Sequence, residues 1–324
     1  MSTILVTGAD GFVGSWTIPA LLRADHRVVA MVRTPEAGAL VRDRLPAAWR
    51  DGVEPRVADV TEPATLGAAF EGADAVLHLA AIPLDRNGGA ELFRVNTGGT
   101  RNVVAAARTA GVRRLIHMGA LGVVDDPALH YASSKAKAEA LVRESGLDWT
   151  ILKPSLQFGE GDGFFNIIAD LIRVSPGIVP VPGDGRSRFQ PIHGGDVARI
   201  VAWCLQDPAT IGQTFELGGP RYWTYREITA EVARALGKSR RVIPLPVPLI
   251  SLVAGTAETA HLPFPVATDQ LRQLRFDNTG PLDVIGPRFG FEPRPMEGAL
   301  GYLRAKLRDQ RTRGDLAGPP GPLS

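Results

Sequence analysis

Cysteine is scarce in this chain, and neither sign of charge is in excess. Cys204 is the single cysteine among 324 residues, which excludes an internal disulfide framework and a cysteine-rich zinc site and favours a reducing, cytoplasmic compartment. The 36 Lys and Arg are balanced by 34 Asp and Glu, so the formal net charge is only +2. This balance argues against a nucleic-acid partner, because such proteins neutralise phosphates with basic residues. No spacing of His, Asp and Glu indicates a metal site.

Long apolar runs are scarce as well. Residues 242–257 are apolar, but Pro244, Pro246 and Pro248 interrupt them, and the stretch is shorter than the ~20 residues that span a bilayer. Core packing is its simplest role, while a cap over an apolar pocket or a contact with a membrane or a partner subunit stays open. The first 15 residues lack the basic stretch of a signal peptide, which again favours a cytoplasmic protein.

The first half of the chain alternates regularly between two patterns. Short β-branched runs are separated by stretches of helical periodicity, which predicts βαβ units on a parallel sheet buried on both faces. Because such crossovers are right-handed, we expect a doubly wound α/β sheet of the Rossmann type. The expected strands are 3–7, 28–32, 57–60, 75–79, 114–118 and 150–152, and the clearest helices are 97–110 and 131–145.

The second half has a different texture, with Pro and Gly gathered in residues 175–185. Short strands are expected at 189–192 and 214–217, and helices at 225–236, 268–276 and 296–307. We therefore expect residues 1–155 to form the Rossmann domain and residues 156–310 a smaller substrate-binding region, part of which returns to the sheet. Residues 311–324 should be a mobile tail.

The strongest motif is a glycine-rich turn between the first strand and the first helix. Gly8, Gly11 and Gly14 let the turn tighten, let the backbone approach a pyrophosphate and let the helix pack close to the sheet. Phe12 and Val13 open the helix, whose free N–H groups and positive dipole end attract phosphate. This placement predicts that residues 1–155 bind a dinucleotide.

Arg33 ends the second strand, at the place where an NAD-binding chain would carry a carboxylate for the ribose 2′-hydroxyl. An arginine there can instead clamp the 2′-phosphate of NADP. We therefore expect NADP, with NAD as the alternative. An exposed surface arginine without a ligand is the other interpretation.

Tyr131 and Lys135 are four residues apart on a predicted helix, so they share one face. A lysine ammonium beside a phenol should lower the pKa of the phenol toward the working pH. The tyrosine could then donate and accept a proton in a carbonyl–alcohol interconversion. An ordinary solvated Tyr/Lys pair is the competing interpretation, and the glycine turn upstream argues against it.

These motifs resemble those of short-chain dehydrogenases/reductases, in the extended and atypical branch that includes NAD-dependent epimerases and dehydratases. The later segments 190–197, 269–271 and 277–278 look most like the nucleotide-binding accessory subunit of respiratory complex I. The segments that carry the main resemblance are TGADGFVG (7–14), DV (59–60), HLAA (78–81), NTGGT (96–100), YASSK (131–135) and KPS (153–155).

The resemblance implies a role for each matching residue. Tyr131 is the catalytic acid and base, and Lys135 holds the hydroxyls of the nicotinamide ribose. The other implied cofactor residues are Gly8, Gly11 and Gly14 at the pyrophosphate, Asp59 and Val60 at the adenine, Ala80 and Ala81 on the ribose side, Asn96, and Pro154 with Ser155 at the nicotinamide.

One departure from the family leaves the function open. Catalytic members carry Ser or Thr after the fifth strand, where this chain has Ala120, and losing such a donor typically lowers the rate by about 10²–10³. The intact Tyr131 and Lys135 favour an NAD(P)-dependent oxidoreductase or epimerase acting on a small carbonyl or alcohol. A non-catalytic NADPH-binding module of an assembly and a redox-sensing regulator are the alternatives. The oligomeric state does not follow from the sequence.

Four residues outside these motifs carry lesser expectations. His193 and Asp196 either line the substrate cleft or serve the fold, with Asp196 capping the next helix and His193 packing between the domains. We expect His78 to be a hydrogen-bonded core histidine and Cys204 to be buried and inert.

Overall fold

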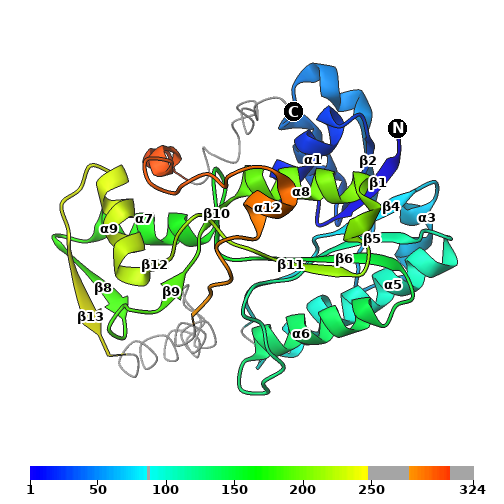
Figure 1. Cartoon of the computed structure of the whole chain (residues 1–324). Helices are drawn as coiled ribbons and strands as arrows, with labels where there is room; N and C mark the ends of the chain where they lie inside the picture. Colours follow the sequence, from blue (N-terminus) through cyan, green and yellow to red (C-terminus); the bar gives the residue numbers. More distant parts are fainter. Residues whose placement is uncertain (86–87, 247–276, 307–324) are drawn as a thin grey trace.

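The computed structural model describes residues 1–85, 88–246 and 277–306. Its centre is a seven-stranded sheet in the order β11-β6-β5-β4-β1-β2-β3 (Figure 1). Every neighbouring pair of strands in this sheet is parallel, as the alternating pattern predicts. The strands are β1 (Thr3–Thr7), β2 (Arg27–Val32), β3 (Val53–Val57), β4 (Ala75–His78), β5 (Arg114–Met118), β6 (Asp148–Pro154) and β11 (Gln213–Leu217).

Helices cover both faces of the sheet, which confirms the doubly wound Rossmann-type fold (Figure 1). One apolar core lies between the sheet and α1 (Phe12–Arg23), α2 (Pro35–Asp43), α8 (Gly194–Gln206) and α12 (Ile285–Phe289). A second core lies between the other face and α3 (Leu66–Phe70), α5 (Gly99–Thr109) and α6 (His130–Arg143). Between β4 and α5 the chain forms the short α4 (Ala90–Leu92) and a π-helical turn, Phe93–Gly98.

A third apolar core lies away from the sheet, in the lobe at the left of Figure 1. It is built from α7 (Phe164–Val174), α9 (Tyr225–Ala235) and the 3₁₀ turn Leu300–Arg304. The two-stranded pairings beside it are β7 (Gln157–Phe158) with β10 (Ile192–His193), β9 (Arg188–Phe189) with β12 (Trp223–Thr224), and β8 (Ile178–Pro182) with β13 (Arg241–Leu245). Between these pieces, α8 and β11 return to the sheet.

Three expected elements within the described residues differ from the structure by more than two residues at an end. The third strand is Val53–Val57 and not 57–60, because Pro55 is tolerated in β3, an edge strand, and residues 58–60 already belong to the following loop. The strand expected at 189–192 is split into β9 and β10 by Pro191, which has no N–H for a ladder. The helix expected at 296–307 is a 3₁₀ turn, Leu300–Arg304.

Helix ends in the first half follow their local sequence. Gly111 and Gly146 have φ of +74° and +70°, and Asp25 has φ of +61°, so all three are left-handed residues just past a helix. Pro19 lies inside α1, which nevertheless continues to Arg23. The expected helix 268–276, most of the apolar stretch 242–257, the segment 269–271 and the expected tail 311–324 lie outside the described residues.

Candidate functional site

A groove of about 600 Å³ runs along the carboxyl ends of the central strands. It crosses the point where the strand order reverses, because β1 lies between β2 and β4, and doubly wound sheets bind their ligands there. The residues that line it are Gly8, Asp10, Gly11, Phe12, Val13, Met31, Val32, Arg33, Ala58, Asp59, Val60, Thr61, Leu79, Ala80, Ala81, Ile82, Pro83, Arg94, Val95, Met118, Gly119, Tyr131, Lys135 and Gln157.

The glycine turn forms the middle of this groove. Gly8 has φ of +65°, and a Cβ there would lie 3.0 Å from the backbone of Ala80, so only glycine lets β1 and the loop after β4 approach so closely. Gly11 donates its N–H to the carbonyl of Gly8 at 3.1 Å and occupies the N-cap of α1 without a side-chain cap from any described residue. The first N–H groups of α1 therefore face the groove ready for an anion, and this cradle fits a pyrophosphate.

Gly14 does not line the groove. A Cβ at this position would lie 2.3 Å from the carbonyl oxygen of Ala9, so Gly14 allows α1 to pack directly on the turn. Gly14 therefore serves the close packing of helix and strand, and its expected contact with the pyrophosphate is not supported.

One end of the groove carries the residues expected at the adenosine half of a dinucleotide. Arg33 is exposed there, and within the part of the chain that the structure describes its guanidinium has no hydrogen bond or ion pair. Asp59 accepts hydrogen bonds from the N–H and hydroxyl of Thr61, both at 2.8 Å, which fixes the loop after β3. Val60 lines the groove beside them. This end of the groove therefore presents the guanidinium of Arg33, a donor group that suits a 2′-phosphate.

The loop after β4 is held from behind by Asn96. Ala80 and Ala81 line the groove as expected, whereas Asn96 is buried and does not. Its amide accepts from the N–H of Ile82 at 2.8 Å and donates to the carbonyl of Ile82 at 3.0 Å, and it also donates to Ser134 on α6. Asn96 thus positions the loop that forms one wall of the groove.

Tyr131 and Lys135 lie in the groove together, as the motif predicts. The Lys135 ammonium donates to the carbonyl oxygen of Met118 at 2.6 Å. Burial lowers the pKa of Lys135 to about 8, although Glu139 opposes the shift. Loss of water contacts and the nearby Glu139 carboxylate raise the pKa of Tyr131 to about 12, so the expected lowering of this pKa is wrong.

Glu139, one turn beyond Lys135, is a buried acid that sequence reasoning missed. Its Oε2 lies 3.1 Å from Arg143 and 3.6 Å from Lys153, both of which partly neutralise it. Its Oε1 is buried and has no hydrogen-bond partner among the described residues. The i, i+4, i+8 spacing of Tyr131, Lys135 and Glu139 is the signal that could have placed this carboxylate on the catalytic face of α6.

The turn after β5 brings Gly119, and not Ala120, into the groove. A Cβ at Gly119 would lie 2.5 Å from Glu139 Oε1, so the carboxylate occupies the space that a serine side chain would need. Ser133 and Ser134 do not replace the absent hydroxyl, since Ser133 bonds to Asp125 and Ser134 bonds to the carbonyl of Tyr131 and to Asn96. The turn after β5 therefore presents no serine or threonine hydroxyl to the groove.

The segment after β6 also differs from expectation. Pro154 and Ser155 are buried and do not line the groove. The Ser155 hydroxyl donates to Asn278 and accepts from the N–H of Gln190, so it ties the sheet to later parts of the chain. Gln157, two residues further, lines the groove instead.

The remaining residues singled out from the sequence serve the fold. His193, at the N-cap of α8, accepts from the N–H of Gly195 and packs 4.8 Å from the ring of Trp16, so the cap is His193 and not Asp196. Asp196 accepts from the N–H of Arg294. Neither residue lines the groove, and the expectation that Asp196 caps α8 is wrong.

His78 and Cys204 lie in the core, as expected. The His78 ring is hydrogen-bonded to the hydroxyls of Thr7 and Thr100, and burial lowers its pKa to about 3. Cys204 is fully buried, which raises the pKa of its thiol to about 12 and keeps it in the unreactive form.

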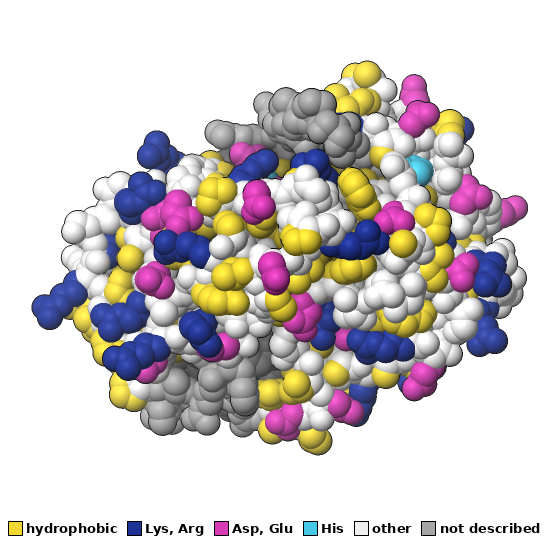
Figure 2. Space-filling view, in the orientation of Figure 1, with side chains coloured by type: hydrophobic (Ala, Val, Ile, Leu, Met, Phe, Trp, Pro, Cys, Tyr) yellow, Lys and Arg dark blue, Asp and Glu magenta, His cyan; other side chains and the backbone are white. Residues whose placement is uncertain are grey.

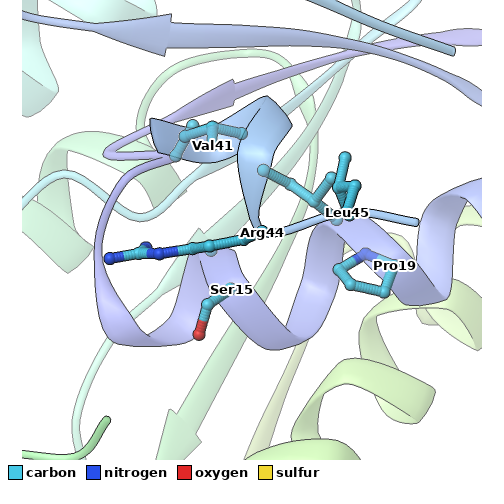
Figure 3. Close-up of a pocket in the computed structure, with 8 residues that line it drawn as sticks. Ser15, Pro19, Val41, Arg44 and Leu45 are labelled. Atoms are coloured by element: carbon cyan, nitrogen blue, oxygen red, sulfur yellow. The ribbon is translucent and has the colours of Figure 1, made fainter. Parts of the chain in front are cut away.

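A second hollow is too small to be a ligand site. It lies between α1 and the end of α2 and is lined by Pro19, Val41 and Leu45 (Figure 3). Its volume is about 10 Å³, room for about one water molecule. At its edge the guanidinium of Arg44 donates to the carbonyl of Asp10 at 3.1 Å and so helps to hold the glycine turn in place.

Charges of both signs are mixed on the surface of the described residues. Lys and Arg are interspersed with Asp and Glu on the face in Figure 2, in keeping with the near-zero net charge. Within residues 1–85, 88–246 and 277–306, no cluster of His, Cys, Asp and Glu has the geometry of a metal site. The same residues include no helix with the length and hydrophobicity of a membrane span.

Comparison with known proteins identifies a matching family and several relatives of this chain. Residues 8–208 match the model of a family described as NAD(P)H-binding. The ceramide reductase of Caulobacter vibrioides is 32% identical over 259 residues, which are 78% of this chain and 76% of that protein. The mitochondrial NADH dehydrogenase (ubiquinone) 1 alpha subcomplex subunit 9 of Arabidopsis thaliana is 26% identical over 288 residues, 86% of this chain and 70% of that protein.

Solved structures agree on the fold. The dTDP-glucose 4,6-dehydratase from Streptomyces venezuelae, crystallised with NAD, matches with a TM-score of 0.70 and 22% identity. The match covers 94% of this chain and 95% of that chain. It extends well past residue 155, so the likeness in fold includes the C-terminal lobe.

Proposed function

The chain belongs to the NAD(P)H-binding family, and on this premise we propose that it is an NADP-linked reductase of a small carbonyl compound, with Tyr131 as the proton donor. The observation that carries the proposal is that a single groove joins the glycine turn to Tyr131 and Lys135. A reduced nicotinamide, when bound, supplies the hydride to the carbonyl carbon. Tyr131 gives its phenolic proton to the carbonyl oxygen, which becomes a hydroxyl.

The charge states of the two side chains favour reduction over oxidation. With a pKa of about 12, Tyr131 is protonated at neutral pH and ready to donate. Lys135, with a pKa of about 8, keeps its positive charge at neutral pH and stabilises the phenolate that remains after the proton has left. The reverse reaction would need the phenolate at its start, which the high pKa disfavours.

The test is turnover of NADPH with a panel of aldehydes and ketones. We expect Tyr131→Phe to lower kcat by about 10²–10⁴ while NADPH affinity stays within about threefold, since the phenol moves a proton and does not anchor the cofactor. Ser133→Ala, on the same helix and outside the groove, is the matched control. Unchanged turnover in Tyr131→Phe would remove the tyrosine from this role.

A second candidate is a non-catalytic module that holds NADPH for the stability of an assembly. Gly119 favours it, because the groove has no serine or threonine side chain at this turn. The likeness to a subunit named for NADH dehydrogenase points the same way. Cofactor that stays bound through purification, together with no turnover of any carbonyl, would support this candidate over the reductase.

A further inference from the structure

Gln157, which lines the end of the groove near Tyr131, has a side-chain amide oxygen without a hydrogen-bond partner among the described residues. It lines the same groove as Tyr131 and Lys135, which lie at the opposite end from Arg33 in the strand order. Its Oε1 is buried and finds no hydrogen-bond partner in the part of the chain that the structure describes. Buried polar atoms are nearly always paired, so a missing partner points to a ligand.

The backbone holds this side chain in place. Gln157 pairs with Ile192 in the short parallel pairing of β7 and β10. The next residue, Phe158, is fully buried and packs 5.1 Å from the ring of His193. Because neighbouring side chains of a strand point to opposite faces, the burial of Phe158 directs Gln157 toward the groove.

The chemistry of the amide defines the ligand group that it fits. Its carbonyl oxygen needs an N–H or O–H donor, and its nitrogen offers two N–H donors in return. A carboxamide supplies both halves of that pairing. The proposed cofactor presents one carboxamide, on its nicotinamide ring, and Ser155, which the family resemblance assigns to that ring, is committed to Asn278 and Gln190.

We infer that Gln157 binds the nicotinamide carboxamide by a reciprocal amide–amide pair, with Oε1 accepting from the carboxamide N–H and the Gln157 nitrogen donating to its carbonyl. The inference rests on the proposed function for the identity of the cofactor. It adds a side-chain contact that fixes the ring beside Tyr131, in a groove whose turn after β5 presents Gly119 and no hydroxyl.

The test compares NADP⁺ with its 3-acetylpyridine analogue, in which a methyl group replaces the carboxamide NH₂. Calorimetric titration should show that the wild-type protein binds NADP⁺ about tenfold more tightly than the analogue. Gln157→Met, which keeps the length and removes both polar atoms, should bind NADP⁺ and the analogue with equal affinity, because NADP⁺ loses two hydrogen bonds and the analogue loses one. Gln157→Glu should keep the preference for NADP⁺, because its carboxylate still accepts from the carboxamide N–H.

Two controls separate this result from a folding defect and from failure of the proposed function. 2′,5′-ADP lacks the nicotinamide and should bind all variants equally. Gln213→Met changes an exposed glutamine of β11 and should alter no affinity. Equal affinity of the wild type for NADP⁺ and the analogue, or an equal loss of both in Gln157→Met, overturns the inference while leaving the cofactor site intact. Absence of binding for all three nucleotides overturns the proposed function and the inference with it.

Discussion

At the scale of single residues, burial decides how the catalytic pair behaves. Sequence spacing correctly put Tyr131 and Lys135 on one face of α6, but it could not show that the ammonium is buried and hydrogen-bonded to Met118. Nor could it show the Glu139 carboxylate, which raises the pKa of both groups. The result is a tyrosine that holds its proton, which suits a reductase.

The pKa of Lys135 predicts how the reduction rate depends on pH. Below about pH 8 the ammonium is charged and stabilises the phenolate left by Tyr131, and above that pH the charge is lost. We therefore expect kcat for carbonyl reduction to be constant near pH 7 and to fall about tenfold per pH unit well above pH 8. Steady-state rates between pH 6 and 10 measure this, and a rate that climbs steadily to pH 10 would contradict it.

The position of Arg33 predicts that the protein binds NADPH more tightly than NADH. Replacing Arg33 by Ala removes charge-assisted hydrogen bonds to a 2′-phosphate, so the Kd for NADPH should rise about 10–100-fold while the Kd for NADH stays the same. Arg27→Ala, at the other end of β2, is the control and should change neither value. Equal effects on both cofactors would show that Arg33 is an ordinary surface residue.

At the scale of elements, α1 depends on a glycine that has no contact with the groove. Gly14→Ala would place a Cβ 2.3 Å from the carbonyl of Ala9, and we expect it to lower the free energy of unfolding by about 1–3 kcal/mol. Gly67→Ala is the matched control, because that exposed glycine of α3 has open space around it and should gain up to about 1 kcal/mol. Urea denaturation measures both, and equal stabilities of the two variants would contradict the packing role.

Much of the first half could be predicted at this scale because its signals are local. The runs at 3–7 and 114–118 match β1 and β5 residue for residue, since buried parallel strands are continuous apolar stretches with clear ends. The strand expected at 57–60 was misplaced because β3 is an edge strand, where Arg56 and Pro55 interrupt the apolar pattern. Short pairings such as β7 with β10 depend on partners about 35 residues away, and no local signal marks them.

At the scale of the whole molecule, a late segment ties the C-terminal lobe to the sheet. Asn278 donates to the carbonyl of Leu121 at 2.7 Å and accepts from the hydroxyl of Ser155, while its own N–H bonds to Arg188. The sequence marked Asp277 and Asn278 only through a family resemblance, and Ser155 was assigned to the nicotinamide. Contacts between residues more than 100 positions apart explain why neither role could be derived from spacing.

Removing the Asn278 side chain should therefore lower the stability of the whole fold. Asn278→Ala removes the donor to the carbonyl of Leu121 and one of the partners of the Ser155 hydroxyl, so we expect a loss of about 1–3 kcal/mol and a melting temperature lower by several degrees. Asp283→Ala, an exposed position five residues later, should leave the melting temperature within about 1 °C. Thermal unfolding followed by circular dichroism checks both, and identical melting temperatures would contradict the bridging role.

For the whole molecule, the sequence predicts the family correctly but does not identify the substrate. The predicted resemblance is confirmed at the level of family and fold. The chain matches the NAD(P)H-binding family, is similar in sequence to the NADH dehydrogenase subunit, and shares its fold with the dTDP-glucose 4,6-dehydratase. The divisions at residues 155 and 310 stay predictions, as do the cytoplasmic location and any membrane or respiratory partner. The groove that holds Tyr131 also holds Gln157, from the later part of the chain, and no single motif encodes both residues.

We propose that the groove around the glycine turn binds a nicotinamide dinucleotide phosphate beside Tyr131. Calorimetric titration of the purified protein with NADPH and with NADH measures this binding. We expect one site per chain, with NADPH bound at least about tenfold more tightly than NADH. Heat signals no greater than those of dilution for both nucleotides would show that the groove binds neither.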